Sequence, residues 1–220
     1  MKFLFSSLGK KIQVALTGIL LSTFLIFHLI NNLVLFTGSE NFNQMVGLLE
    51  SIKPLIRVME FGLLLIIVTH VLNAVYLTIS NRRAATSRYN VDASATSSVN
   101  SRTMIISGTI ILLFFIIHLR YIWFTYQAHL FLNANETYYD VLLRNQLGYL
   151  GHTPTAVFYI VAILFIASHL KHGVQSALKT FGLNEKSKWK ILYKGSVILW
   201  GFIPFAFIVI VLSIQVGIIK

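Results

Sequence analysis

Four histidines are the residues of this sequence that could do chemistry, because each lies alone inside a separate long apolar run. They are His28, His70, His118 and His169. Three of them, all but His70, follow a phenylalanine four residues earlier and precede a leucine. An ionisable side chain inside a membrane is costly and by default marks a functional site with a polar partner. Since neutral imidazole is also a metal ligand, the four histidines predict a shared centre inside a helical bundle.

The composition is that of a polytopic membrane protein. The 220 residues are 56% hydrophobic and 11% charged, with a mean hydropathy of +0.75. The formal net charge of +11 sits at the ends of the apolar runs, which indicates membrane topology and a cytoplasmic partner rather than nucleic acid. The sequence has no cysteine, which excludes disulfides, thiolate-held clusters and haem attached through thioethers.

Five apolar runs are long enough to cross a bilayer, at about 20 residues per crossing. They cover roughly residues 12–36, 55–80, 103–127, 155–180 and 192–219. The basic N-terminus followed by apolar residues resembles a signal peptide, but the first run is too long and no small-residue cleavage site follows it. We therefore predict a single all-α domain over residues 1–220 with five transmembrane helices, four of them forming a haem-binding bundle. Between the spans, residues 41–52 and 135–147 have helical apolar spacing and are expected along the interface, whereas 90–100 reads as a loop.

Lysine and arginine concentrate in alternate connections, which predicts a cytoplasmic N-terminus and a periplasmic C-terminus. The basic connections precede the first helix, join the second to the third, and join the fourth to the fifth. They carry Lys2, Lys10, Lys11, Arg82, Arg83, Arg88, Arg102, Lys179, Lys186, Lys188, Lys190 and Lys194. Prolines at 54 and 154 suit helix starts, and Pro204 inside the fifth run should kink that helix.

The depth of each histidine sorts the four into two pairs. His28 lies 17 residues after Lys11, and His118 lies 16 residues after Arg102. Both histidines are therefore about 24–25 Å from the inner end of their helices. His70 and His169 lie 12 and 10 residues in, or roughly 15–18 Å. We therefore expect an outer pair, His28 with His118, and an inner pair, His70 with His169.

Small and polar residues share the helix stripes of the histidines, and such residues belong at helix interfaces. The stripe of His28 carries Thr17, Gly18, Asn31 and Asn32; that of His70 carries Gly62, Asn73 and Ala74; that of His118 carries Ser107, Gly108 and Thr125; that of His169 carries Ala162, Gly173 and Ser176. All four histidines are therefore expected to face the interior of the bundle.

Two stacked pairs of neutral imidazoles match two haems, each of which needs an axial nitrogen on both faces. Zinc would need more ligands at each site, and a proton relay would need carboxylates beside the histidines. A histidine satisfied by a neighbouring hydroxyl or carbonyl is the alternative for any single one. His172 is the alternative fourth ligand, since it lies three residues after His169; otherwise His172 and Lys171 are expected near haem propionates. A non-haem membrane protein that uses its histidines in proton-coupled transport is the alternative function.

The sequence resembles the dihaem cytochrome b membrane subunit of succinate:menaquinone reductase and quinol:fumarate reductase over nearly the whole chain. The resemblance rests on residues 6–11 (SSLGKK), 15–18 (ALTG), 28–33 (HLINNL), 36–38 (FTG), 169–173 (HLKHG), Ser176 and 181–182 (FG). It implies two b-type haems, with His28 and His118 holding the outer one and His70 and His169 the inner one. It also implies a bacterial cytoplasmic membrane, and a complex with an FAD-containing flavoprotein and an iron–sulfur subunit, which could form a dimer of heterotrimers.

The resemblance further implies electron transfer between the iron–sulfur subunit and a quinone. The quinone, menaquinone in this family, is expected near the outer haem, and the iron–sulfur subunit is expected at the inner basic loops. Glu60, ten residues before His70, is the candidate proton carrier for the quinone, and Glu50 is the second candidate. The alternative for Glu60 is an ion pair with Arg57. Ala167 stands where some family members carry an acid two residues before the fourth ligand, so the resemblance does not extend to a transmembrane proton path there. Neither does it decide between succinate oxidation and fumarate reduction.

Overall fold

The computed structural model describes residues 3–86, 99–131, 136–183 and 190–220, and its regular structure is helical throughout. In chain order the segments are α1 (Ser7–Leu33), η1 (Val34–Thr37), α2 (Ser39–Ser51), α3 (Lys53–Thr86), α4 (Val99–His118), η2 (Leu119–Trp123), α5 (Phe124–Phe131), α6 (Tyr138–Leu143), α7 (Thr153–Thr180), α8 (Lys190–Val197), η4 (Ile198–Phe202) and α9 (Ile203–Gln215). The first η segment is a 3-10 helix, and the other two are π-helical.

Five stretches of these helices are long and apolar enough to cross a membrane, which confirms the predicted number. They cover Ser7–Thr37, Lys53–Arg83, Thr103–Ala128, Thr153–Thr180 and Lys194–Gln215. The prolines at 54 and 154 lie in the first turns of α3 and α7, where a missing N–H removes no helical hydrogen bond. The π-helical turn η4 lies directly before Pro204, at the point where the proline ring and its missing N–H interrupt regular α-helical bonding.

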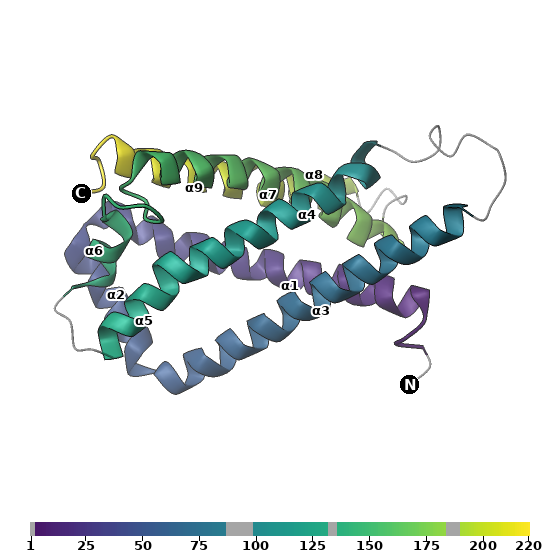
Figure 1. Ribbon diagram of the computed structural model, residues 1–220, viewed down its shortest axis with the longest axis horizontal. Coiled ribbons are helices and arrows are strands. Elements are labelled where there is room, and N and C mark those ends of the chain that lie inside the picture. Colours follow the sequence, from purple (N-terminus) through teal and green to yellow (C-terminus); the bar gives the residue numbers. More distant parts are fainter. Residues whose placement is uncertain (1–2, 87–98, 132–135, 184–189) are drawn as a thin grey trace.

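The helices pack as two antiparallel pairs joined along one side. α3 packs on α1, α4 packs on α7, and α1 packs on α7, while among the described residues α3 and α4 make no comparable contact. The fifth crossing, formed by α8, η4 and α9, packs against α7 and, through α9, against α1 (Figure 1). Large side chains such as Phe61, Leu72 and Phe205 point outward and are more than 60% exposed, as expected for helices that face lipid.

The two ends of the bundle differ in structure and charge. At one end, called the capped end here, α2 and α6 lie across the long helices, and the C-terminus is at the same end (Figure 1). At the other, called the basic end, α1 and α4 begin and α3 and α7 finish, and the described lysines and arginines of the basic connections are at this end. The helices expected within 41–52 and 135–147 are present as α2 and α6; their predicted position along the membrane interface stays a prediction.

The capped end is held by local polar contacts. Thr137 and Asp140 form a capping box that starts α6, because each side chain accepts a hydrogen bond from the other's backbone N–H. Arg144 pairs with Glu136 and donates a hydrogen bond to the Tyr149 hydroxyl at 3.0 Å. The hydrogen bond with Glu136 raises the pKa of Arg144, so its charge is retained. These contacts fix α6 over the end of the bundle.

Some of the predicted segments lie outside the residues that the structure describes. The loop expected at 90–100 falls almost wholly outside the described residues, as do Lys186 and Lys188 of the basic connection before α8.

Candidate functional site

The structure brings the four membrane histidines together in the two pairs that their depths predict. The rings of His28 and His118 have centroids 5.9 Å apart and lie nearly perpendicular, at 88°. The rings of His70 and His169 have centroids 6.5 Å apart at an angle of 67°. Two imidazoles bound to opposite sides of one metal ion at about 2 Å each would place their centroids roughly 6 Å apart. Rings in direct contact have similar separations, so the groups that surround each ring carry the argument.

The two pairs lie at different levels of the bundle. Tyr159 of α7 contacts His118 of the outer pair, and His169 of the inner pair follows ten residues later on the same helix. At 1.5 Å of rise per residue, the two levels are about 15 Å apart. Each level therefore has one pair of histidines, contributed by α1 and α4 at the outer level and by α3 and α7 at the inner level.

A hydroxyl group holds the Nδ1 atom of each inner histidine. Thr17 Oγ1 lies 3.0 Å from Nδ1 of His70, and Ser107 Oγ lies 3.2 Å from Nδ1 of His169. Both hydroxyls also donate to a carbonyl oxygen of their own helix; for Thr17 this is the carbonyl of Gln13, at 2.6 Å. Since each hydroxyl has one proton and has already donated it, its oxygen accepts a hydrogen bond from Nδ1–H of the imidazole.

This hydrogen-bond direction sets the tautomer of both rings. With Nδ1 protonated, the neutral imidazole of His70 or His169 keeps its free lone pair on Nε2. Metal-binding histidines are usually prepared in this way, because a partner for the far N–H fixes the ring orientation and raises the basicity of the ligand nitrogen. The inner pair therefore presents two oriented Nε2 lone pairs inside an apolar bundle.

A glycine follows each of these hydroxyl residues and lies against the ring, where a Cβ atom would make an ordinary van der Waals contact. A Cβ atom at Gly18 would lie 3.4 Å from Cε1 of His70, and one at Gly108 would lie 3.6 Å from Cε1 of His169. From the sequence, Thr17 and Gly18 were predicted on the same face of their helix as His28, and Ser107 and Gly108 on the same face as His118. The prediction of the face was correct. However, they contact the inner histidines of the antiparallel neighbours, because ten residues of helix separate the two levels.

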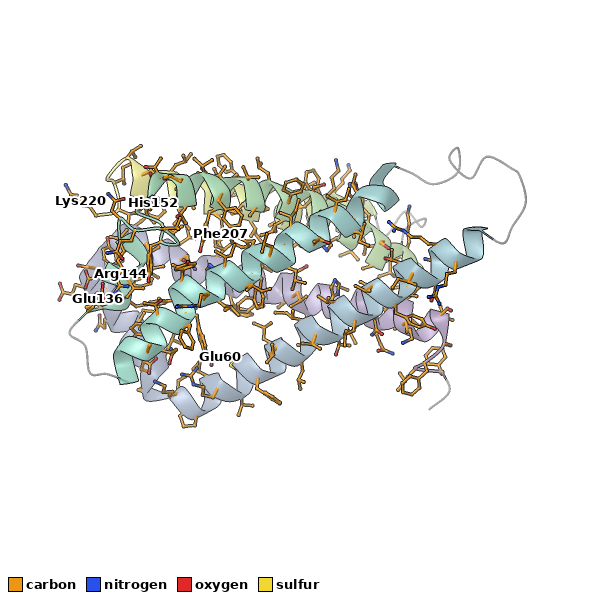
Figure 2. All side chains as sticks on the ribbon, in the orientation of Figure 1. Glu60, Glu136, Arg144, His152, Phe207 and Lys220 are labelled. Atoms are coloured by element: carbon orange, nitrogen blue, oxygen red, sulfur yellow. The ribbon has the colours of Figure 1, made fainter. Side chains whose placement is uncertain are left out.

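Aromatic side chains enclose the outer pair. Phe24 stacks on His28 with centroids 5.5 Å apart, and Phe114 stacks on His118 at 5.6 Å. The phenol oxygen of Tyr159, a residue only 4% exposed, lies 3.2 Å from Nδ1 of His118. Sequence reasoning missed Tyr159, because a single tyrosine on an apolar helix carries no pattern; only its spacing from His169, one level away, could have indicated it. The ring of Phe207 of α9 lies 5.6 Å from His28 (Figure 2).

The alternative fourth ligand, His172, lies apart from the inner pair. The ring that faces His70 is that of His169, and His172 lines a groove with Ser168 and Trp200. Lys171 Nζ lies 5.0 Å from the centroid of the Trp200 ring. Two residues along an α-helix correspond to a turn of about 200°, so Lys171 is on the face of α7 opposite His169.

Glu60 lies at the capped end in a network that joins α3 to the following crossing (Figure 2). One of its carboxylate oxygens pairs with Arg57, as the alternative reading of this residue expects, and the other accepts a hydrogen bond from Trp123 Nε1 at 2.8 Å. Arg57 also donates to Gln127. The π-helical turn η2 ends at Trp123, and such turns are frequent at functional sites. The second candidate, Glu50, pairs with Lys53 at 2.7 Å on the adjoining turn.

The described residues contain no group of three or more histidine, cysteine or acidic side chains that could hold a metal ion. A zinc site of four protein ligands needs such a group, whereas a haem iron needs only one axial ligand on each face. No family model matches the chain, and no curated protein and no solved structure matches it. The candidate site therefore rests on the geometry of the histidine pairs alone.

Replacing Thr17 with valine is expected to destabilise the protein by about 1 kcal/mol, because it removes the hydroxyl oxygen that lies 3.0 Å from Nδ1 of His70. The matched control is Thr23→Val on the same helix, where an exposed hydroxyl bonds only to the Ile19 carbonyl. The measurement is the free energy of unfolding in mixed micelles titrated with dodecyl sulfate. Equal losses in the two variants would show that the contact between Thr17 and His70 contributes nothing.

Proposed function

We propose that this chain is the membrane-anchor cytochrome b subunit of a succinate:menaquinone oxidoreductase of the succinate dehydrogenase or fumarate reductase type. Its role would be to pass electrons between an iron–sulfur subunit and a quinone through two b-type haems. The observation that carries the proposal is the pair of inner histidines, each with a hydroxyl of the neighbouring helix within hydrogen-bond distance of Nδ1 and with its ring facing the other. If the histidines were only structural, there would be no reason for the same hydroxyl contact at Nδ1 to occur on two different histidines whose rings face one another.

The residues present fit two haems, one at each level. His70 and His169 would hold the inner haem, with their rings oriented by Thr17 and Ser107. His28 and His118 would be the ligands of the outer haem, where stacked phenylalanines exclude water and Tyr159 engages His118. When bound, the haems would supply reversible one-electron chemistry at a potential that the ligands and their surroundings tune. The protein's part is to orient the imidazoles and to keep both sites dry.

The surfaces at the two ends match different partners. The basic end would face the cytoplasm, where Arg82 and Arg83 of α3 could contact the iron–sulfur subunit; a role in topology alone is the alternative for each. The flavoprotein, with its FAD and dicarboxylate site, would lie beyond that subunit. The capped end would face the periplasm in a bacterial cytoplasmic membrane, and the quinone would react near the outer histidines at that end.

Glu60 is the residue of this chain that we propose as the proton carrier for the quinone. It is half-buried, lies ten residues from His70 towards the capped end, and has both carboxylate oxygens held in place. A carboxylate positioned in this way can hold and release a proton as the quinone is reduced or the quinol oxidised. Arg57, Trp123 and Gln127 would be positioning residues for it.

Two haems per chain are expected in the purified protein, and alanine variants should divide the histidines by level. His28→Ala or His118→Ala should remove one haem, His70→Ala or His169→Ala should remove the other, and His172→Ala should keep both. The measurement is haem per chain by the pyridine haemochrome assay, with reduced-minus-oxidised spectra. His152→Ala is the control, since His152 lies at the start of α7 and its ring has a hydrogen bond with Thr155, at 3.0 Å, away from both histidine pairs. A wild-type protein without haem would overturn the proposal and favour the non-haem alternative.

The orientation can be tested cleanly because the sequence has no cysteine. We expect a membrane-impermeant maleimide added to intact spheroplasts to label Asn41→Cys on α2 at the capped end, and not Lys179→Cys at the end of α7. Both positions are exposed, so both variants should react once the membrane is permeabilised. Labelling of the Lys179 variant alone in intact cells would reverse the predicted topology.

Glu60→Gln is expected to lower the quinone reaction of the assembled complex on the order of 100-fold, the usual contribution of a positioned proton carrier. Haem content should be unchanged, because glutamine keeps an acceptor for Trp123. Glu40→Gln is the control, since Glu40 is an exposed carboxylate in the first turn of α2. Full activity of the Glu60 variant, with loss in Glu50→Gln, would assign the role to Glu50.

A further inference from the structure

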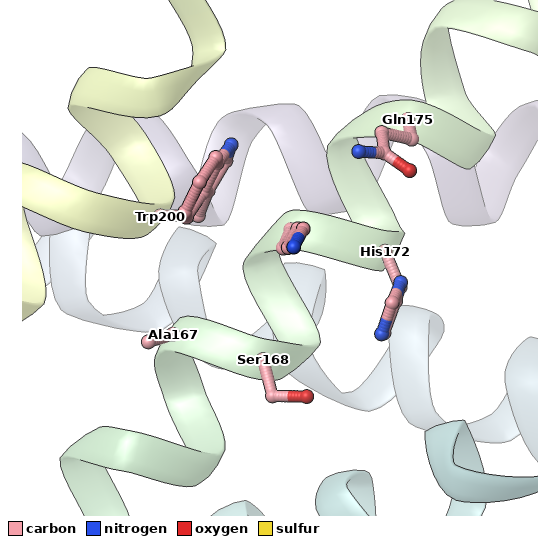
Figure 3. Close-up of a pocket in the computed structure, with 6 residues that line it drawn as sticks. Ala167, Ser168, His172, Gln175 and Trp200 are labelled. Carbon is pink, nitrogen blue, oxygen red and sulfur yellow. The ribbon is translucent and has the colours of Figure 1, made fainter. Parts of the chain in front are cut away.

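A polar groove of about 460 Å³ lies between α7 and the π-helical turn η4, on the outside of the four-helix bundle. It is lined by Ala167, Ser168, Lys171, His172, Gln175 and Trp200. Figure 3 shows Trp200 approaching from the fifth crossing and the other side chains presented along α7. This groove uses none of the four paired histidines.

Lys171 is the unusual residue of the groove, because it is a cation inside a membrane-spanning helix. Neither α7 nor the fifth crossing, residues 190–215, contains an aspartate or glutamate to pair with it. Its ammonium group lies over the Trp200 ring, and this cation–π contact offsets part of the cost of its position. The ring face satisfies one side of an ammonium group that has three N–H donors.

The depth of Lys171 corresponds to the edge of the hydrocarbon layer. The 28 residues of α7 span about 42 Å, which exceeds a hydrocarbon core of about 30 Å by roughly 6 Å at each end. Lys171 is nine residues before the end of α7, so its backbone lies roughly 7 Å inside the boundary at the basic end. A lysine side chain reaches that far, and tryptophan is also typical of this interface.

A second groove provides an internal comparison. It has a similar volume, about 450 Å³, and lies between α1, α7, α8 and η4. Its lining is mainly apolar, with Ser22, Thr23 and Ser196 as the polar members and no charged or imidazole side chain. Positive charge is therefore a property of the groove at Lys171 and not of the contact between α7 and the fifth crossing in general.

We propose that the groove at Lys171 binds the phosphate headgroup of an anionic phospholipid from the leaflet at the basic end. Lys171 would supply the point charge that binds phosphate, and the Ser168 hydroxyl can donate a hydrogen bond to a phosphate oxygen. Basic grooves between membrane helices on the cytoplasmic side are suited to such headgroups. None of the four paired histidines lines the groove; His172, the alternative fourth ligand, does, but the lipid proposal uses only Lys171 and Ser168.

The test is native mass spectrometry of the delipidated protein titrated with dioleoyl phosphatidylglycerol or dioleoyl phosphatidylcholine. We expect the wild-type protein to bind the anionic lipid about five-fold more tightly than the zwitterionic one, the effect of one lysine near an anionic surface. Lys171→Gln should lose this preference, whereas Lys179→Gln should keep it, because Lys179 is exposed on the same helix and does not line the groove.

Two further arms separate the remaining explanations. Ser168→Leu fills the groove without removing charge and should also abolish the preference, so the test does not rely on the lysine variant alone. Inorganic phosphate at the lipid concentration should leave the lipid bound; displacement by it would assign the groove to a free anion and overturn the lipid proposal. An equal preference in the wild-type protein and in Lys171→Gln would overturn it as well.

Discussion

An imidazole inside an apolar bundle has two nitrogens to satisfy, and the way this chain satisfies them organises the rest of its structure. One nitrogen can bond to a hydroxyl of an adjacent helix, which requires that helix to bring a small side chain to the correct level. In the inner pair, Thr17 and Ser107 do this for His70 and His169. The requirement fixes the antiparallel packing of α1 with α3 and of α4 with α7, since each hydroxyl and its histidine are on different helices. The second nitrogen is then available to a metal.

The outer pair meets the same constraint differently. His28 and His118 are covered by stacked phenylalanines, and the polar partner of His118 is a phenol from α7. The fifth crossing contributes to this level as well, through Phe207 of α9. Aromatic side chains therefore surround the outer histidines, whereas hydroxyl groups of neighbouring helices bond to the inner ones. The two histidine pairs would thus give their ligands different surroundings.

Much of this could be predicted from the sequence, because hydropathy and helical rise are local properties. Five crossings, the small helices at the capped end, the proline positions and the pairing of histidines by depth all follow from counting residues. The partner of each hydroxyl could not be predicted, since helix spacing assigns Thr17 to a face but does not say which neighbour lies there. Tyr159 and the π-helical turn before Trp123 were missed for a related reason: both depend on packing between helices, and neither leaves a repeat in the sequence.

The two hydroxyl–glycine dipeptides have a further consequence. Residues 17, 18, 24 and 28 recur as 107, 108, 114 and 118 at a constant offset of 90, with serine in place of threonine at the first position and identical residues at the other three. Each copy belongs to a helical hairpin, α1 with α3 or α4 with α7, and each hairpin completes its own hydroxyl contact internally. Both histidine pairs, in contrast, take one ring from each hairpin. Membrane helices associate after they have inserted, so each hairpin can orient its inner histidine before meeting the other, and a ligand pair exists only once the two halves have docked.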